Sequence, residues 1–243
     1  MYIKINDPDF KKKIKAFLMN GPAVSYGSAT QMIGPTIVAY DDERKVLLLY
    51  GTDFTGSGTL FSYAEISAEA NGATEPVFVP DFRTFADTLD TMDYECDIEF
   101  TDDGYVLSND RLNVSQTFDF GEAPDILANF MAIYECPDKL GKHAYVHVFT
   151  VNGRDLAKLQ SLNKKTARED AYVFSDGSIA TSTSQLTVDP VGSMQPHTVV
   201  GVDPILYAAK SLGQVKVYVI DEPLSIEFHS PLCTYVFIEA GDE

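Results

Sequence analysis

The stretch VPDFRTFADTLDTMDYECDIEFTDDGYVLS, residues 79–108, combines one helix pattern with the strand patterns that follow it. Its apolar residues first recur at the three- and four-residue spacing of one helix stripe, which predicts a helix over residues 80–93. Residues 95–100 and 105–108 then flank the acidic turn TDDG and read as short antiparallel strands. The order of helix, strand, acidic turn and strand is the unit from which we interpret the rest of the chain.

The same unit recurs in the second half of the sequence. A shift of 123 residues places Phe82 and Phe85 on Ile205 and Ala208, and a strand, the turn DEP and two further strands follow, in VKVYVI, LSIEF and TYVFIEA. A shift of about half the chain predicts a tandem duplication. The alternative is that two amphipathic helices align by chance, but the matching strand rhythm favours duplication.

Two more helices are predicted, and nearly all other patterned segments are strands. The first covers residues 7–20, with Asp7 as N-cap and Pro8 at the first helical position, and the other covers residues 153–168. The repeated unit adds a helix over residues 202–213, with Gly213 as its stop. Further strands are predicted at 36–40, 46–50, 60–66, 112–118, 144–151, 172–174, 179–183, 215–220, 224–228 and 235–239. Short alternating strands with few helices indicate an α+β fold with antiparallel sheets.

Composition excludes several classes of protein. The 243 residues are 45% hydrophobic and 22% charged, which is typical of a globular protein. Without a long apolar run or a hydrophobic leader, we expect neither a membrane span nor secretion. Cys96, Cys136 and Cys233 lack metal-site spacing and are expected to be reduced thiols in the cytoplasm, the host cytoplasm for a phage protein.

Charge is distributed unevenly between predicted helices and the remainder of the chain. The formal net charge is −18, from 18 Lys+Arg and 36 Asp+Glu. The four predicted helices, 56 residues in all, hold 11 of the basic and 8 of the acidic residues, so they carry +3 and the remainder −21. This segregation predicts a basic surface built from helices and suited to a polyanion such as DNA.

The basic residues also fall on the outward faces of these helices. In the helix predicted over residues 153–168, one stripe opposite Leu156, Leu159 and Leu162 is formed by residues spaced four, three, four and three apart: Arg154, Lys158, Ser161, Lys165 and Arg168. A single such stripe is more often a solvated face, but four helices sharing this property favour DNA contact. The predicted DNA-facing residues are Lys11, Lys12, Lys15, Arg83, Arg154, Lys158, Lys165, Arg168 and Lys210.

The pattern resembles DNA polymerase sliding clamps of the proliferating-cell-nuclear-antigen fold, most closely the shorter clamps of tailed phages. The resemblance is carried by residues 79–108, by PLSIEF at 223–228 and by TYVFIEAGDE at 234–243. It implies a first clamp domain at 1–120, an interdomain connecting loop at 121–142 and a second clamp domain at 143–243. It also implies antiparallel sheets outside, four helices on the inner face and no catalytic site or cofactor.

The resemblance further implies a ring, expected to be a homotrimer, that encircles duplex DNA without reading sequence and tethers polymerase and other replication proteins. Residues 112–118 of one subunit would pair with residues 185–191 of the next, and a clamp loader would place the ring on DNA. Partner peptides would dock at positions of the loop and the C-terminal strand: Ala123, Pro124, Ile126, Leu127, Pro223, Tyr235 and Phe237. For Tyr235 and Phe237 the alternative is that both belong to the core.

No motif of an enzyme or a metal site is found in the sequence. It lacks GxxxxGK[ST], HExxH, GxSxG and GxGxxG. His143 and His147 share a strand face but have no third ligand, so a structural role is favoured over a metal site. Two rivals remain open: an acidic virion, regulatory or scaffold protein that does not encircle DNA, and a hydrolase whose site has no familiar motif.

Overall fold

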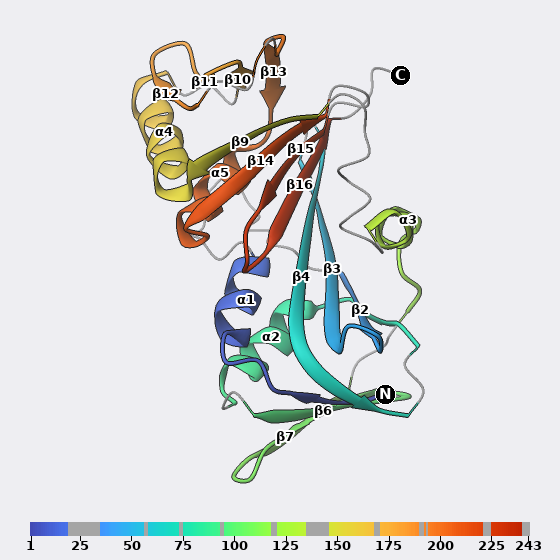
Figure 1. Ribbon diagram of the computed structural model, residues 1–243. Helices are drawn as coiled ribbons and strands as arrows, with labels where there is room; N and C mark the ends of the chain where they lie inside the picture. The colour runs from blue at the N-terminus through green and yellow to red at the C-terminus, as the bar shows by residue number, and fades with distance from the viewer. Residues whose placement is uncertain are drawn as a thin grey trace. The chain divides into compact units, whose positions relative to one another are not determined.

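The computed structural model describes most of the chain, and its contacts divide into two compact units. The described residues are 1–18, 35–55, 58–72, 75–92, 95–117, 121–134, 146–167, 171–189, 192, 194–220 and 225–239. Unit 1 consists of Met1–Leu18, Gln31–Asp53 and Ser62–Glu135, and unit 2 chiefly of Cys136–Glu243. Each unit is described by itself below (Figure 1).

Unit 1 holds three helices and most residues of the eight strands of the first half, two of which have residues within Phe54–Phe61, a segment that belongs to unit 2. In chain order these are β1 (Tyr2–Ile5), α1 (Phe10–Phe17), β2 (Thr36–Asp41), β3 (Val46–Thr55), β4 (Gly58–Asn71), β5 (Val77–Val79), α2 (Phe82–Asp90), β6 (Cys96–Thr101), β7 (Gly104–Ser108), β8 (Asn113–Thr117) and α3 (Asp125–Tyr134). Five strands pair in the order β8-β7-β6-β1-β4, while β2 pairs with β3 and β5. All of these registers are antiparallel, as the alternating sequence predicts.

Helices α1 and α2 lie side by side in unit 1 and join their apolar stripes (Figure 1). The rings of Phe17 and Phe82 meet edge to face at 5.2 Å, and Phe85 of α2 contacts Tyr105 of β7 at 4.8 Å. These side chains are essentially buried, so aromatic packing holds the helix pair against the β6–β7 hairpin. The outward faces of both helices are left to polar residues.

Unit 2 contains a similar set of strands and helices. Its elements are β9 (Val146–Asn152), α4 (Gly153–Thr166), β10 (Ala171–Ser175), β11 (Ser178–Ala180), β12 (Gln185–Thr187), β13 (His197–Val200), α5 (Asp203–Ala208), the 3-10 helix η2 (Ala209–Ser211), β14 (Gln214–Ile220), β15 (Ser225–His229) and β16 (Thr234–Glu239). One sheet has the order β16-β15-β14-β9 and the other β12-β11-β10-β13. Helix α4 contacts both α5 and η2.

The order of elements confirms the repeat that the sequence predicts. Both halves run strand, helix, four strands, helix, three strands, and their pairings correspond: β6-β7-β8 with β14-β15-β16, β1-β6 with β9-β14, and β5-β2-β3 with β13-β10-β11. The α+β class with antiparallel sheets is therefore confirmed. The domain limits at 120 and 142 stay a prediction.

Several predictions about single elements were wrong. Residues 121–142 were expected to form a loop, but α3 occupies Asp125–Tyr134 and contacts β2, so a fifth α-helix adds to the expected four. Strands β1, β5 and β13 were not predicted, because each has only three or four residues and too few alternations to stand out. Within the described ranges, no helix is long and apolar enough to cross a membrane.

Candidate nucleic-acid interface

Helix α1 places its lysines around a buried stripe. Phe10, Ile14 and Phe17 are buried, and Lys12 and Lys15 are exposed. The helix begins at Phe10, with Asp9 at the N-cap, so both lie two residues later than predicted. The cause is Asp7, whose carboxylate is engaged outside the helix.

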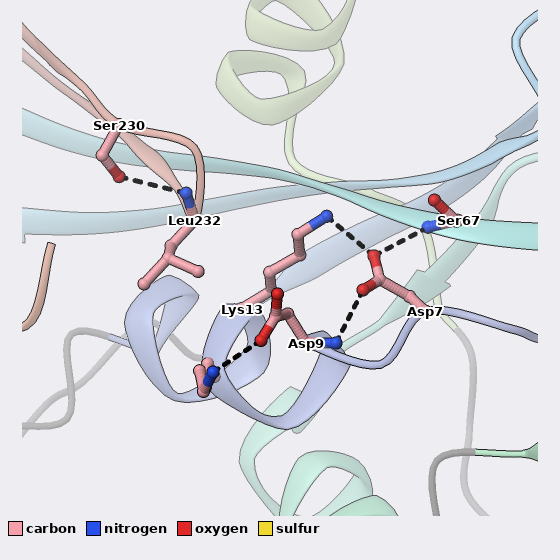
Figure 2. Close-up of polar contacts among 7 residues, drawn as sticks. Asp7, Asp9, Lys13, Ser67, Ser230 and Leu232 are labelled. Atoms are coloured by element: carbon pink, nitrogen blue, oxygen red, sulfur yellow. Dashed lines mark hydrogen bonds and ion pairs between the residues drawn. The ribbon is translucent and has the colours of Figure 1, made fainter.

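Asp7 anchors the start of α1 instead of capping it (Figure 2). Its carboxylate accepts hydrogen bonds from Ser67 N at 3.0 Å, Asp9 N at 2.8 Å and Lys13 Nζ at 2.7 Å. Burial opposes ionisation of Asp7, but these three bonds outweigh it and lower the pKa of the carboxyl group. Lys13 is thereby turned away from any DNA-facing role.

The other lysines of α1 are tied to α2 or to the first turn. Lys11 Nζ donates to the backbone oxygen of Asp90 at 2.7 Å, and Lys15 Nζ lies 3.1 Å from the Asp90 carboxylate. Lys12 Nζ lies 2.6 Å from Asp9 Oδ1 and is largely exposed. Lys11 and Lys15 therefore share one surface with the end of α2, while Lys12 is paired within its own segment.

Arg83 extends this surface along α2. Asp81 caps the helix by accepting from Thr84 N, and the stripe of Phe82, Phe85, Ala86 and Leu89 is buried. Arg83 lies on the exposed side, with its Nε 3.8 Å from Asp87 Oδ2.

Helix α4 carries the predicted basic stripe of unit 2. Arg154, Lys158 and Lys165 are all exposed, and Arg168 lies outside the described residues. The prediction that Leu162 points inward was wrong, because 49% of that residue is exposed. Gln160 and Asn163 are buried instead, so that the inner face of α4 is partly polar.

Helix α5 and η2 pack against α4, and η2 carries the exposed Lys210. Lys210 is exposed, and its Nζ donates to Tyr207 Oη at 2.6 Å and lies 4.0 Å from the Tyr207 ring centroid. Gly153 at the start of α4 donates its N–H to Gly213 O at 2.7 Å. A Cβ at Gly153 would lie 1.9 Å from Ala209 O, so the close approach of α4 and η2 requires glycine.

A buried polar group fixes α4 against its neighbours in unit 2. Tyr172 on β10 donates its hydroxyl to Asp203 Oδ1, and Lys164 Nζ lies 3.7 Å from Asp203 Oδ2. Asp203, the first residue of α5, is 4% exposed, and Val202 is the N-cap of that helix. Lys164 is thus oriented inward, whereas Arg154, Lys158 and Lys165 are not.

Two predicted interface strands end their sheets. Among the described strands, β8 is last in the order β8-β7-β6-β1-β4, and β12 is last in β12-β11-β10-β13. Both are exposed along much of their length, and Leu112 just before β8 is 41% exposed. An unpaired strand edge offers backbone groups to another chain.

The predicted peptide-binding residues are divided between unit 1 and unit 2. Tyr235 and Phe237 are fully buried, so neither offers surface to a peptide, and Pro223 lies outside the described residues. Burial raises the pKa of Tyr235 well above its usual range. Leu127 is also buried, because it faces inward from α3.

Ala123 does line a pocket within unit 1. The pocket has a volume of about 490 Å³ and is open to solvent. Its lining is mainly apolar, with Asp102 as its carboxylate: Ile37, Pro76, Val77, Phe78, Thr101, Asp102, Gly121, Ala123, Ala128 and Met131. Pro124 and Ile126 lie at the adjoining start of α3, where Pro124 O accepts from Leu127 N.

The candidate metal pair stays untested, because His143 lies outside the described residues. His147 lies on β9 opposite Val219. In the part of the chain that the structure describes, no group of three His, Cys, Asp or Glu side chains is placed to hold a metal ion.

The sequence reading missed the acidic partners of the helix cations. Asp9, Asp87 and Asp155 stand three or four residues from Lys12, Arg83 and Lys158, and that spacing was a usable signal. No sequence signal links Asp90 to Lys15, because the pair joins two helices.

Comparison with known proteins shows which solved structures have a similar fold. No family model matches the sequence, and no curated protein sequence matches it. Three similar structures are the Helicobacter pylori beta clamp bound to a DNA ligase peptide (TM-score 0.70, 14% identity), Caulobacter crescentus pol III beta (0.66, 14%) and the DNA polymerase III subunit beta from Pseudomonas aeruginosa (0.61, 14%).

These matches cover 99%, 99% and 100% of this chain, respectively, but 66% of each matched chain. The chain thus spans just under two-thirds of the length of the clamps it matches. Because the likeness extends over both units, it concerns the whole described fold. The chain has the fold of the DNA polymerase III beta sliding clamps.

Proposed function

We propose that the protein is a DNA polymerase processivity factor, a sliding clamp that encircles duplex DNA and tethers polymerase and other replication proteins. The observation that carries the proposal is the combination of clamp fold and charge: the described residues of the predicted basic surface lie on helix faces, on a chain of net charge −18. A ring holds DNA by topology, so diffuse contacts to phosphate suffice and base readout is unnecessary.

The ring is proposed to contain three copies. Three chains that each span 66% of a matched clamp amount to about two of the longer chains. The edges of β8 and β12 that no other described strand pairs with support a head-to-tail contact that closes, since pairing them removes both edges. A place among the clamps of tailed phages, with a clamp loader as partner, is part of the same proposal.

The proposed partner site is the pocket beside Ala123. Its apolar lining suits a hydrophobic anchor of a peptide, and Asp102 suits a basic neighbour of that anchor. Ala128→Trp should fill the pocket and weaken binding of a peptide from the partner polymerase in a fluorescence titration. Wild-type affinity in that variant would refute this location.

Molar mass and shape test the ring. Light scattering should give about three times the 26.8 kDa of one chain, and negative-stain images should show a closed ring with a central hole. Nicked plasmid should retain the protein at high salt and release it after linearisation, because only topology survives screening. A monomer at every concentration would overturn the proposal in favour of an acidic scaffold protein.

A further inference from the structure

Four cations of the proposed DNA surface, Lys12, Lys15, Arg83 and Lys158, each lie beside a carboxylate on or next to these helices. In unit 1, Lys12 Nζ lies 2.6 Å from Asp9 Oδ1, and Lys15 Nζ lies 3.1 Å from Asp90 Oδ1. The hydrogen bond from Lys12 to Asp9 raises the pKa of Lys12, so this cation is held in its charged and paired form.

The same arrangement recurs on α2 and, independently, in unit 2. Arg83 Nε lies 3.8 Å from Asp87 Oδ2, and Lys158 Nζ lies 2.9 Å from Asp155 Oδ1 on α4. The four pairs are solvent-exposed: 72% of the Lys12 side chain and 73% of the Lys158 side chain are accessible. Phosphate can therefore reach each cation, but the carboxylate beside it repels phosphate and offsets part of the positive charge.

Helix α4 also provides the contrast. Arg154 and Lys165 are exposed on the same stripe as Lys158, yet within the described ranges neither has an acidic partner. The stripe thus places Lys158, which is paired with a carboxylate, between Arg154 and Lys165, which are not paired with one within the described residues. On a surface of uniformly free cations, each phosphate contact would release counterions and strengthen binding.

We propose that Asp9, Asp87, Asp90 and Asp155, the competing carboxylates, act as intramolecular competitors of DNA phosphate. They keep the helix surface near electroneutrality, so that DNA contacts it weakly and moves along it, while Arg154 and Lys165 supply the uncompensated attraction. The inference rests on the proposed function and adds the residues that set the strength of DNA contact.

Neutralising the competing carboxylates tests this directly. The helix variant is Asp9→Asn, Asp87→Asn, Asp90→Asn and Asp155→Asn in the full-length protein. A matched control variant removes the same charge from exposed acids outside the helices of unit 1, by Glu43→Gln, Glu69→Gln, Glu75→Gln and Glu99→Gln. Both variants change the net charge from −18 to −14, so a difference between them reports position and not total charge.

The readout is the fluorescence anisotropy of a short labelled duplex over a salt series. Each exposed pair is expected to hold back binding by about two- to fivefold, so the helix variant should bind at least about tenfold more tightly than wild type at low salt. Its plot of log affinity against log salt should steepen by up to about 0.9 for each released cation. The control variant should change both quantities far less.

A double-mutant cycle on α4 separates local competition from long-range charge. Asp155→Asn should raise affinity in the wild-type background but much less in Lys158→Gln, because the cation it releases is then absent. An equal gain in both backgrounds, or equal gains in the helix and control variants, would overturn the inference while leaving encirclement intact. Wild type that neither forms a ring nor stays on circular DNA would overturn the proposed function itself.

Discussion

Lys13 Nζ lies 2.7 Å from Oδ2 of Asp7, and both side chains are largely buried, with 18% and 5% of their surfaces accessible. The pair connects the first turn of α1 to β4, because the same Asp7 oxygen accepts from Ser67 N. A lysine in the most basic stretch of the chain therefore stabilises the fold rather than the DNA surface.

Asp7→Ala should destabilise the protein by about 3 kcal/mol, because it leaves the largely buried Lys13 ammonium without its carboxylate and the Ser67 N–H without its acceptor. Urea unfolding followed by circular dichroism measures this. Asp9→Ala is the control: it removes the exposed partner of Lys12 and should cost less than about 1 kcal/mol. Similar losses in the two variants would contradict the anchoring role of Asp7.

The stability contributed by Asp7 should depend on pH in a defined direction. Because the pKa of Asp7 is lowered in the folded state, its ionised form stabilises the fold above the unfolded pKa of about 3.9. This contribution is lost as pH falls through the lower folded value. The difference in unfolding free energy between wild type and Asp7→Asn should therefore be constant near neutrality and narrow below about pH 4.

Gly153→Ala should destabilise unit 2 by about 3 kcal/mol, because the new Cβ would lie 1.9 Å from the backbone oxygen of Ala209. The clash involves backbone, so it can be relieved only if α4 and η2 move apart. Ser161→Ala, on the exposed face of α4, is the control and should leave the midpoint of thermal unfolding nearly unchanged. Full stability of Gly153→Ala would show that the two elements are not held at this distance.

Tyr172→Phe should cost about 1–3 kcal/mol, because it removes a buried hydrogen bond to the carboxylate of Asp203. Tyr207→Phe provides a matched change at an exposed hydroxyl, which accepts from Lys210, and should stay within about 0.5 kcal/mol of wild type. Chemical unfolding of both variants gives the comparison. Equal effects would mean that the buried group does not hold α4.

Thr187→Pro should disrupt the proposed ring without unfolding the chain. Along an antiparallel strand, residues that bond to the neighbouring strand alternate with residues whose N–H points the other way. Val188 N donates to Gly177 O and Ser184 O accepts from Thr181 N, so residues 184, 186 and 188 face β11. Thr187 therefore directs its N–H to the free edge of β12. Proline removes that donor and is tolerated on an edge. Light scattering should give a lower molar mass than for wild type, while the circular dichroism spectrum stays unchanged. A variant that assembles like wild type would show that β12 does not form the interface.

Periodicity alone located the helices that carry the basic residues and most of their flanking strands. The stripes of α1 and α2 are buried as predicted, and Gly213 ends its segment with a positive φ of 73°. Such features are local, since one helix face or one turn is encoded by neighbouring residues. The tandem order of elements was predictable for the same reason.

Elements with no local signature were missed. Helix α3, in DILANFMAIY, lacks a polar face that would distinguish it from a loop between glycine and proline residues, and it is held by contacts such as that of Phe130 with Tyr50 on β3. Leu162 was assigned to the core from spacing, yet Gln160 and Asn163 are buried in its place. Packing partners from distant strands decided these positions.

The sequence by itself determined that basic residues concentrate on helices, because composition and periodicity are properties of the chain. Only the tertiary structure decided which of those cations are available. Lys13 is used by Asp7, Lys15 is paired with Asp90 of another helix, and Lys165 is left exposed. The physical reason is that a charge acts through neighbours within a few ångströms, and folding, not sequence order, supplies most of them.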